Sequence, residues 1–289
     1  MSMSTTARVP FIDAHHHLWD IDLHHYPGLA DPRSPIARHY RLDDFLADAA
    51  DWPLVKSVHV QGEIDRAQSL AETAWLQSIA DERGFPHGIV AYAALQDPRL
   101  DQVLQAHAQH ANVRGIRQIL NPDQCERPDY LTDPAWRAGY ARLADYGLSF
   151  DLQALPEQFA DASAVAAAHP NVPVVVNHTG MPRDQTPAGL IRWRRAMRLL
   201  ADLPHVSVKI SGFGMFDPAW TTASIRPLIL ETIEIFGVDR CMLASNFPVD
   251  KVWASLDRLM EAFEASTADL SAAEQRKLFH DNAERTYRL

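Results

Sequence analysis

The stretch Phe11-Ile12-Asp13-Ala14-His15-His16-His17-Leu18-Trp19-Asp20 sets the interpretation of the whole chain. It begins with an apolar run and ends in aromatic and acidic residues, which predicts a short buried strand at 9–13 that runs into a loop. Side chains alternate along an extended chain, so we expect Asp13, His15 and His17 on one face and His16 on the other. Paired imidazoles at a strand end can bind a divalent metal or polarise a substrate oxygen. A His-rich surface strand end is the alternative.

Seven further apolar runs follow, and helical stretches alternate with them. The predicted strands are 9–13, 55–61, 88–95, 113–120, 148–154, 173–178, 205–211 and 240–245. The predicted helices are 43–50, 66–83, 99–111, 133–146, 156–168, 187–202, 222–236 and 251–265, with one more at 271–284. Glycine and proline end several of these helices, and no linker interrupts the series, which indicates a single domain over residues 1–289.

Eight strands that alternate with eight helices predict a (β/α)8 TIM barrel of the α/β class, with an extra C-terminal helix. The alternative is an open, doubly wound parallel sheet. The glycine-rich phosphate-binding motifs G-x-G-x-x-G and G-x-x-x-x-G-K-[ST] follow none of the predicted strands, which favours the barrel. A barrel places all strand C-termini on one rim, so functional polar residues should be concentrated there.

Composition narrows the classes of partner. The 289 residues carry a formal net charge of −10, which argues against nucleic acid and anionic membranes as partners. Two cysteines are too few for a disulfide framework, and the first residues have no apolar segment of a signal peptide. We therefore expect a cytoplasmic enzyme with a small-molecule substrate. The sequence does not indicate an oligomeric state.

Polar residues do follow the predicted strands. The segments at the strand ends are 59–63, 96–97, 117–118, 151–153, 177–180, 209–212 and 245–250. His178 lies between the apolar run 174–176 and a Gly-Met-Pro turn. A lone histidine there would usually be a core residue bound to a carbonyl. On the same rim as His15 and His17, however, it predicts a metal site or an acid–base site.

Two cations lie inside predicted strands. Alternation places Arg117 on the same face as Gly115 and Ile119, and a buried guanidinium requires a partner. That partner is either an internal carboxylate or a substrate carboxylate, which would bind as a bidentate pair. Lys209 could be a Schiff-base nucleophile, a charge stabiliser or the partner of a buried acid, and we favour the last.

Five motifs occur in an order that resembles a known family. They are 13–19 (DAHHHLW), 115–118 (GIRQ), 177–182 (NHTGMP), 208–212 (VKISG) and 245–248 (SNFP), and 278–287 (LFHDNAERTY) is similar to the family's closing helix. The chain resembles the amidohydrolase superfamily, in the amidohydrolase 2 branch with sugar-acid lactonases and pyrone dicarboxylate lactonase. The resemblance spans nearly the full chain and implies a (β/α)8 hydrolase that opens a lactone. It also implies His15, His17 and His178 as site histidines and Arg117 as a contact for a substrate carboxylate.

The chain departs from this pattern in the last motif. The family has an aspartate there, which binds metal and acts as base toward water, whereas this chain has Asn246. An amide has no proton-accepting carboxylate and is a poor metal ligand. We therefore expect the water-activating role to pass to Asp250, Asp151, Asp97 or a histidine.

The metal prediction follows from the same departure. His15, His17 and His178 are the candidate ligands of a divalent ion, for which zinc is the first choice. Because Asn246 replaces the family aspartate, the ion is expected to be weakly bound or dispensable.

These features together predict hydrolysis of a small, carboxylate-bearing lactone. The substrate would bind Arg117, and its carbonyl would be polarised by His178, by Lys209 or by a loosely held divalent ion. Water would attack with general-base help from His15 and His17. The remaining candidates are Asn246 and Asp250 as catalytic residues, and Gln153 and Trp19 as substrate contacts.

Three other functions stay open. Two are enzymes of the same superfamily, a metal-dependent decarboxylase and a lactone isomerase. The third is a catalytically degenerate barrel that binds a small acid, an alternative that Asn246 keeps open.

Overall fold

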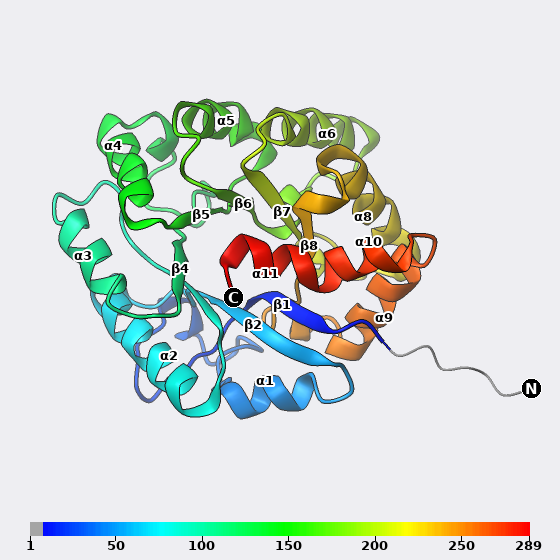
Figure 1. Ribbon diagram of the computed structural model, residues 1–289, viewed down its shortest axis with the longest axis horizontal. Helices are drawn as coiled ribbons and strands as arrows, with labels where there is room; N and C mark the ends of the chain where they lie inside the picture. The colour runs from blue at the N-terminus through cyan, green and yellow to red at the C-terminus, as the bar shows by residue number, and fades with distance from the viewer. Residues whose placement is uncertain (1–7) are drawn as a thin grey trace, which may run out of the picture.

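The computed structural model describes residues 8–289. Residues 1–7, which the predicted domain includes, lie outside this described part. Eight parallel strands form one sheet in sequence order, and helices surround it (Figure 1). The strands are β1 (Phe11–His16), β2 (Leu54–Val60), β3 (Gly88–Ala91), β4 (Val113–Ile116), β5 (Ser149–Leu152), β6 (Val174–Val176), β7 (Val206–Ile210) and β8 (Cys241–Leu243). The structure confirms the predicted (β/α)8 barrel.

Two backbone hydrogen bonds join the first strand to the segment after the last. The His17 N–H donates to the Phe247 carbonyl oxygen at 2.7 Å, and the Asn246 N–H donates to the His15 carbonyl oxygen at 2.8 Å. Residues 230 positions apart along the chain therefore meet where the barrel closes. This closure places the histidine motif of β1 directly beside Asn246.

Most predicted helices are present, with shifted ends. The helices are α1 (Leu42–Asp48), α2 (Ser69–Arg83), α3 (Leu100–His107), α4 (Pro134–Arg142), α5 (Phe159–Ala168), α6 (Pro187–Ala201), α7 (Phe213–Phe216), α8 (Thr222–Phe236), α9 (Leu256–Thr267), α10 (Ala272–Arg276) and α11 (Asn282–Tyr287). A π-helical turn, Lys277–Asp281, links α10 to α11, so the predicted C-terminal helix is confirmed. The short helix α7 was not predicted. Within residues 8–289, no helix has the length and apolarity that a membrane crossing requires.

Several strands are shorter than predicted because apolar residues continue beyond the last paired residue. In β4, for example, pairing ends at Ile116, yet Ile119 and Leu120 of the following loop are still buried. A run of hydrophobic residues reports burial, and it does not distinguish a strand from the loop that follows it. The predicted order of strands was therefore correct, although their C-terminal ends were not.

The expected face of Asp13 was also wrong. Ile12 and Ala14 belong to the apolar cluster inside the barrel, so Asp13 between them lies on a different face. Asp13 instead accepts hydrogen bonds from the Ser245 N–H (2.9 Å) and hydroxyl (2.5 Å). The pairing of β1 with β2 is irregular between Asp13 and His16. This irregularity interrupts the strict alternation of side chains between the two faces of the strand and changes the direction of the side chains that follow.

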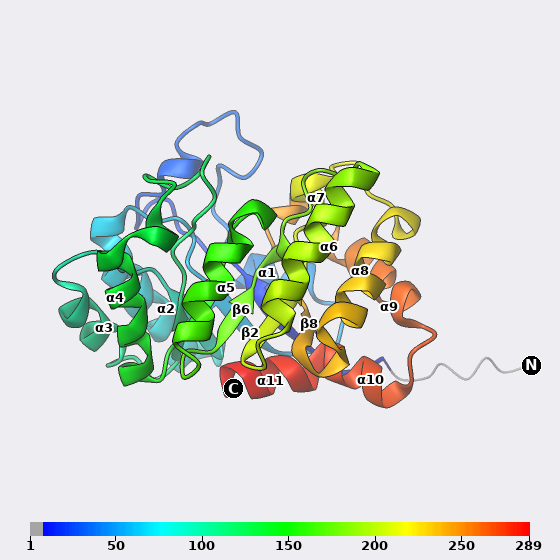
Figure 2. The same ribbon diagram turned by 90° about the horizontal axis from the view of Figure 1, so that it is seen from above.

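The barrel has two different ends. In the view of Figure 2, α10 and α11 lie along the lower edge, while the loop between β1 and α1 projects at the upper edge. Ala283 and Tyr287 of α11 pack into the interior cluster with Val58, Val175 and Met242. The C-terminal helix therefore closes one end, and the polar strand ends remain at the other.

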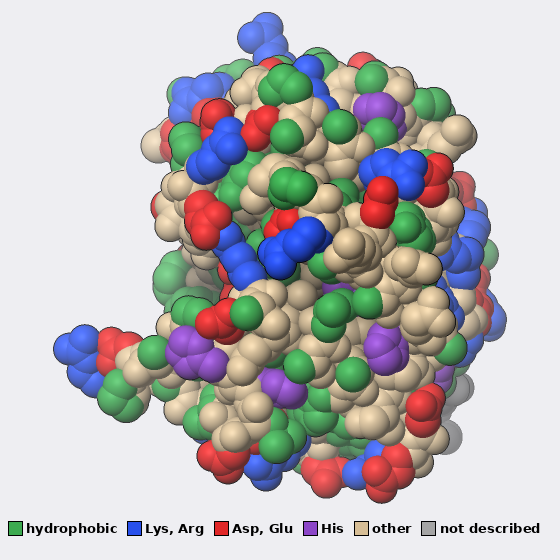
Figure 3. All heavy atoms as spheres, turned by 90° about the vertical axis from the view of Figure 1, so that its left-hand side faces the viewer, with side chains coloured by type: hydrophobic (Ala, Val, Ile, Leu, Met, Phe, Trp, Pro, Cys, Tyr) green, Lys and Arg blue, Asp and Glu red, His purple; other side chains and the backbone are tan. Residues whose placement is uncertain are grey.

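The outer face over α2, α3 and α4 carries acidic and basic side chains interspersed with one another (Figure 3). Several of these charges are paired, as in Arg99 with Asp97 at 3.1 Å and Arg142 with Asp101 at 2.9 Å. A face of mixed sign does not provide the broad basic surface that nucleic-acid binding uses.

Candidate active site

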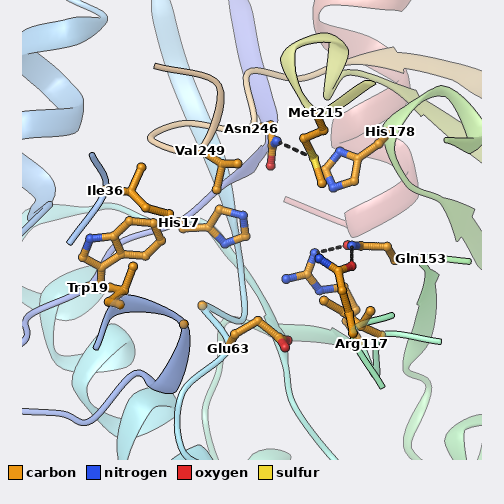
Figure 4. A pocket seen from close by; sticks show the side chains of 15 residues that line it. His17, Trp19, Ile36, Glu63, Arg117, Gln153, His178, Met215, Asn246 and Val249 are labelled. Carbon is orange, nitrogen blue, oxygen red and sulfur yellow. Dashed lines mark hydrogen bonds between the residues drawn. The ribbon is translucent and has the colours of Figure 1, made fainter. Parts of the chain in front are cut away.

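A cavity of about 240 Å³ opens at the C-terminal ends of the strands. The lining residues come from the strand ends and from the long loop after β1, and the close-up shows their side chains gathered around one space (Figure 4). They are His17, Trp19, Gly28, Leu29, Ile36, Gly62, Glu63, Arg117, Ile119, Gln124, Gln153, His178, Met215, Asn246 and Val249. This is where a TIM barrel places its active site.

Three of the lining residues have left-handed backbone conformations. Glu63 follows β2 with φ 59°, His178 follows β6 with φ 51°, and Asn246 follows β8 with φ 58°. Such values are costly for residues that carry a Cβ, and they occur preferentially at functional sites. The fold therefore bends the chain sharply at each of these strand ends to aim a side chain.

A glycine after β7 makes room for one of these side chains. Gly212 has φ +75°, and a Cβ on it would lie 2.7 Å from the Cβ of His178. A larger residue would therefore displace the His178 ring. The segment after β7 thus positions a histidine that comes from β6.

The structure brings the three predicted histidines together. The ring centroids of His15 and His178 are 4.6 Å apart, and those of His15 and His17 are 5.0 Å apart. His17 and His178 line the cavity, whereas His15 lies beneath them and does not reach it. The neighbouring His16 points to the other side of β1, where it stacks on Phe45.

Each ring has a hydrogen-bond partner that orients it. His17 Nδ1 lies 2.8 Å from the Val60 carbonyl oxygen, so Nδ1 carries the proton and Nε2 keeps its lone pair. His178 Nδ1 lies 3.1 Å from the Ser211 hydroxyl. His15 Nδ1 lies 3.4 Å from the Lys209 ammonium, and its Nε2 is buried without a partner.

Burial keeps these imidazoles neutral. The pKa of each of His15, His17 and His178 is lowered well below its ordinary value, chiefly because the protonated ring would lose its hydration. The nearby Arg117 charge lowers all three pKa values further, and Lys209 adds to this effect at His15 and His178. At neutral pH the rings are therefore hydrogen-bonding groups rather than cations.

The imidazoles and Asn246 form an incomplete ligand set for a divalent metal. The unpartnered Nε2 of His15 and the Nε2 lone pair of His17 are suitable donors. Within residues 8–289, however, the groups of three His, Cys, Asp or Glu with ligand atoms inside 4.8 Å do not include the His15, His17 and His178 trio. The fourth position offers an amide in place of a carboxylate. This donor set does not fit a closed metal centre.

Two clusters outside the cavity meet that distance criterion. They are Asp20, Asp22 and His39, and His280, Asp281 and Glu284. Each already binds a basic side chain, Arg41 at 2.6 Å in the first and Lys56 at 2.7 Å in the second. Neither includes a residue that lines the cavity.

Arg117 is a buried cation with neutral partners. Its guanidinium donates to the Gln153 side-chain oxygen at 2.8 Å and to the Gln61 carbonyl oxygen at 2.7 Å, and its Nε has no partner. Only 2% of the residue is exposed, and burial lowers its pKa. Among the described ion pairs within 4.0 Å, none involves Arg117. In the described part of the chain, the internal carboxylate that the sequence left open as its partner forms no ion pair with Arg117, although the nearby Glu63 charge opposes the fall in the Arg117 pKa.

Lys209 lies beneath the cavity and does not line it. Its ammonium donates to Asp151 at 2.6 Å, and Tyr287 of α11 donates to the same carboxylate at 2.9 Å. Both Lys209 and Asp151 are fully buried. This arrangement is the buried acid pairing that the sequence favoured for the lysine.

The acids proposed to replace the family aspartate lie away from the cavity. Asp250 is buried behind Asn246, 3.4 Å from its amide nitrogen, and burial raises the pKa of Asp250 to about 8. Asp151 is bound by Lys209, and Asp97 pairs with Arg99. The carboxylate that does line the cavity is Glu63, which the sequence analysis placed at a strand end without assigning it a role.

The two predicted substrate contacts outside the histidine group do line the cavity. Gln153 faces Arg117, and Trp19 lies nearly parallel to the His17 ring with centroids 6.0 Å apart. The sequence did not single out Met215, which accepts from Asn246 at 3.3 Å, because it belongs to the unpredicted helix α7. The long loop after β1, expected to serve a site, supplies Gly28, Leu29 and Ile36.

The comparison with protein families decides the assignment. A family model described as amidohydrolase matches residues 12–289. The chain belongs to the amidohydrolase family. This amidohydrolase is 44% identical to the uncharacterized protein y4mH of Sinorhizobium fredii, over 97% of this chain and 99% of that protein.

Two further relatives come from Burkholderia multivorans. The L-fucono-1,5-lactonase of that organism is 29% identical, over 96% of each chain. A crystal structure of an amidohydrolase from B. multivorans with bound zinc has a TM-score of 0.85 and 29% identity, and it covers 97% of this chain and 99% of its own. A probable 2-pyrone-4,6-dicarboxylic acid hydrolase from Acinetobacter baumannii, at 17% identity and a TM-score of 0.76, shares the fold.

Proposed function

We propose that this amidohydrolase hydrolyses a small lactone that carries a carboxylate. The observation that carries the proposal is Arg117, a buried guanidinium at the cavity whose partners are both neutral. An unpaired buried charge is costly, and a substrate carboxylate would compensate it through the N–H groups that remain. The lactonase relative in B. multivorans supports the same reaction class.

The proposed reaction uses the groups around the cavity. The substrate carboxylate binds Arg117, and the ring carbonyl oxygen lies against His178, whose Nε2 can donate once Ser211 holds Nδ1. Water attacks the carbonyl carbon, the ring C–O bond breaks, and a hydroxy acid is released. Two proton acceptors line the cavity near the attack site, the lone pair of His17 and the carboxylate of Glu63.

We also propose that a divalent metal is weakly held or dispensable in this reaction. Asn246 in place of a carboxylate and the spacing of the three imidazoles support this view. We expect a chelator to lower turnover less than twofold. An Asn246→Asp variant should gain about one metal ion per chain by elemental analysis. Complete loss of wild-type turnover with chelator, restored by zinc, would refute it.

The test of the reaction is a panel of lactones assayed in water labelled with oxygen-18. Hydrolysis should add one water per turnover and place one heavy oxygen in the new carboxylate. Carbon dioxide release would assign a decarboxylase instead, and a product of unchanged mass would assign an isomerase. Failure of the whole panel to react, with tight binding of small acids, would assign the degenerate binding barrel.

A further inference from the structure

Glu63 is the one acidic residue among the side chains that line the cavity, all of which belong to the described part of the chain. The other carboxylates near the barrel mouth are engaged elsewhere: Asp13 by Ser245, Asp151 by Lys209, and Asp250 behind Asn246. Glu72 is buried next to the turn after β2, where its carboxylate accepts a hydrogen bond from the Gly62 N–H at 3.0 Å. A carboxylate base that reaches a substrate in this cavity must therefore be Glu63.

The backbone of Glu63 is held in an unfavourable conformation by a buried side chain. Its φ of 59° lies in the left-handed region, as do those of His178 and Asn246. The Gln61 amide oxygen accepts the Glu63 N–H at 2.7 Å, and the Gln61 amide nitrogen donates to the Glu63 carboxylate. Gln61 is 1% exposed, so the side chain that holds Glu63 is itself buried. Backbone strain that the surrounding structure maintains is typical of functional sites, so the conformation of Glu63 indicates a functional side chain.

The close-up shows where the Glu63 side chain points (Figure 4). Glu63 lies across the cavity from Asn246, and its carboxylate points toward Arg117 (Figure 4). A carbonyl oxygen directed at His178 would leave the opposite side of the lactone open to water from the Glu63 side. The Glu63 carboxylate therefore lies within the same cavity as His178, where it can reach a water molecule above or below the plane of a bound ester.

Charge favours Glu63 over His17 as the proton acceptor. A proton on His17 would create a second cation near Arg117, inside a buried part of the site. The Glu63 side chain carries a negative charge rather than a positive one, and it is exposed, so water can reach its carboxylate. We propose that Glu63 is the general base of this enzyme, in the role that the family assigns to the aspartate replaced here by Asn246.

This inference rests on the proposed lactone hydrolysis, and its steps balance. The carboxylate of Glu63 takes one proton from water as the water oxygen bonds to the carbonyl carbon. When the tetrahedral intermediate collapses, the ring C–O bond breaks and the same proton passes to the departing alkoxide. The product is the open hydroxy acid, and Glu63 is again a carboxylate. Water is the only co-reactant.

The experiment compares three variants on whichever lactone the wild-type enzyme hydrolyses. Glu63→Gln and Glu63→Ala should lower kcat about 10²- to 10⁴-fold, the usual contribution of a general base, with KM changed less than threefold. Added formate should restore at least a tenth of kcat to Glu63→Ala, because it supplies the missing carboxylate. Glu157→Gln, an exposed glutamate after β5, removes the same charge outside the cavity and should keep wild-type kcat.

The contrary results are equally specific. A Glu63→Gln variant that keeps kcat and raises KM would assign Glu63 to substrate binding and overturn the proposal. A Glu63→Ala variant with unchanged kcat would overturn it as well, and so would a fall in kcat that formate does not restore while Glu63→Gln keeps the wild-type kcat. If the wild-type enzyme hydrolyses no lactone, the proposed function fails first, and this outcome is recognised before any variant is made.

Discussion

Arg117 shows how one residue can serve function at the expense of stability. Two neutral acceptors share a buried positive charge that a carboxylate would balance better. A residue retained for structure alone would have an acidic partner, as Lys209 does in Asp151. The lack of an ion pair at Arg117 supports the proposal that this residue binds the carboxylate of a substrate.

An Arg117→Met variant should separate these two effects. We expect kcat/KM for the lactone to fall at least 100-fold, while the free energy of unfolding in urea stays within about 1 kcal/mol of wild type, because no buried carboxylate loses its partner. Arg114→Met, on the same strand but bonded to the backbone near the closed end, is the matched control for activity. A loss of about 3–5 kcal/mol in stability would instead mark Arg117 as half of a structural ion pair.

Elements around the cavity are held together by buried polar contacts between consecutive units. Glu72 lies in the first turn of α2. Its carboxylate accepts a hydrogen bond from the Gly62 N–H, which ties the turn after β2 to this helix. Burial raises the pKa of Glu72 to about 8, with the nearby Glu63 charge adding to the shift. At neutral pH the folded protein therefore holds a proton on Glu72 that the unfolded chain would release.

Glu72→Gln should therefore stabilise the protein as pH rises. Below the ordinary carboxyl pKa of 4.5 both states are protonated and the variant should match wild type. Between there and pH 8 the unfolded wild-type chain ionises while the folded one does not, so wild type loses stability that the neutral amide keeps. We expect a gain on the order of 4 kcal/mol near pH 8, measured by urea unfolding across the pH range. A pH-independent difference would contradict the assigned pKa.

The barrel as a whole divides its work between two ends. The open end carries the cavity, with its strained strand termini and unpaired cation. The closed end is filled by α11, whose Tyr287 hydroxyl donates to Asp151 at 2.9 Å and 3.1 Å. In TIM barrels the C-terminal ends of the strands usually carry the active site, and the opposite end contributes to stability.

Tyr287→Phe tests this division. Removing the hydroxyl leaves the buried Asp151 carboxylate with one donor fewer, so we expect a loss of about 1–3 kcal/mol in the free energy of unfolding. The variant's kcat/KM should change less than threefold, since Tyr287 does not line the cavity. Tyr146→Phe, which loses a hydrogen bond to the Asp101 carbonyl at an exposed site, should cost much less stability. A large loss of activity without loss of stability would show that the two ends are coupled through Lys209 and His15.

Local patterns were enough to predict the barrel, because burial repeats along the chain with the period of each element. The same reasoning placed Arg117 correctly on the inner side of the barrel with Ile119, although Arg117 lies one residue beyond the last residue of β4, Ile116. It failed for Asp13, because the register of β1 against β2 is irregular there, and register is a property of two strands rather than one.

Contacts between distant segments decided the rest of the site. Lys209 meets His15 across 194 positions, and this contact keeps His15 below the cavity instead of in it. Glu63 lines the cavity because the Gln61 side chain binds the Glu63 N–H and holds the Glu63 backbone in the left-handed region. The sequence of residues 59–63 does not predict this conformation. The sequence shows which side-chain types follow each strand. The direction in which those side chains point depends on steric contacts and hydrogen bonds that form only when the eight strands have closed into the barrel.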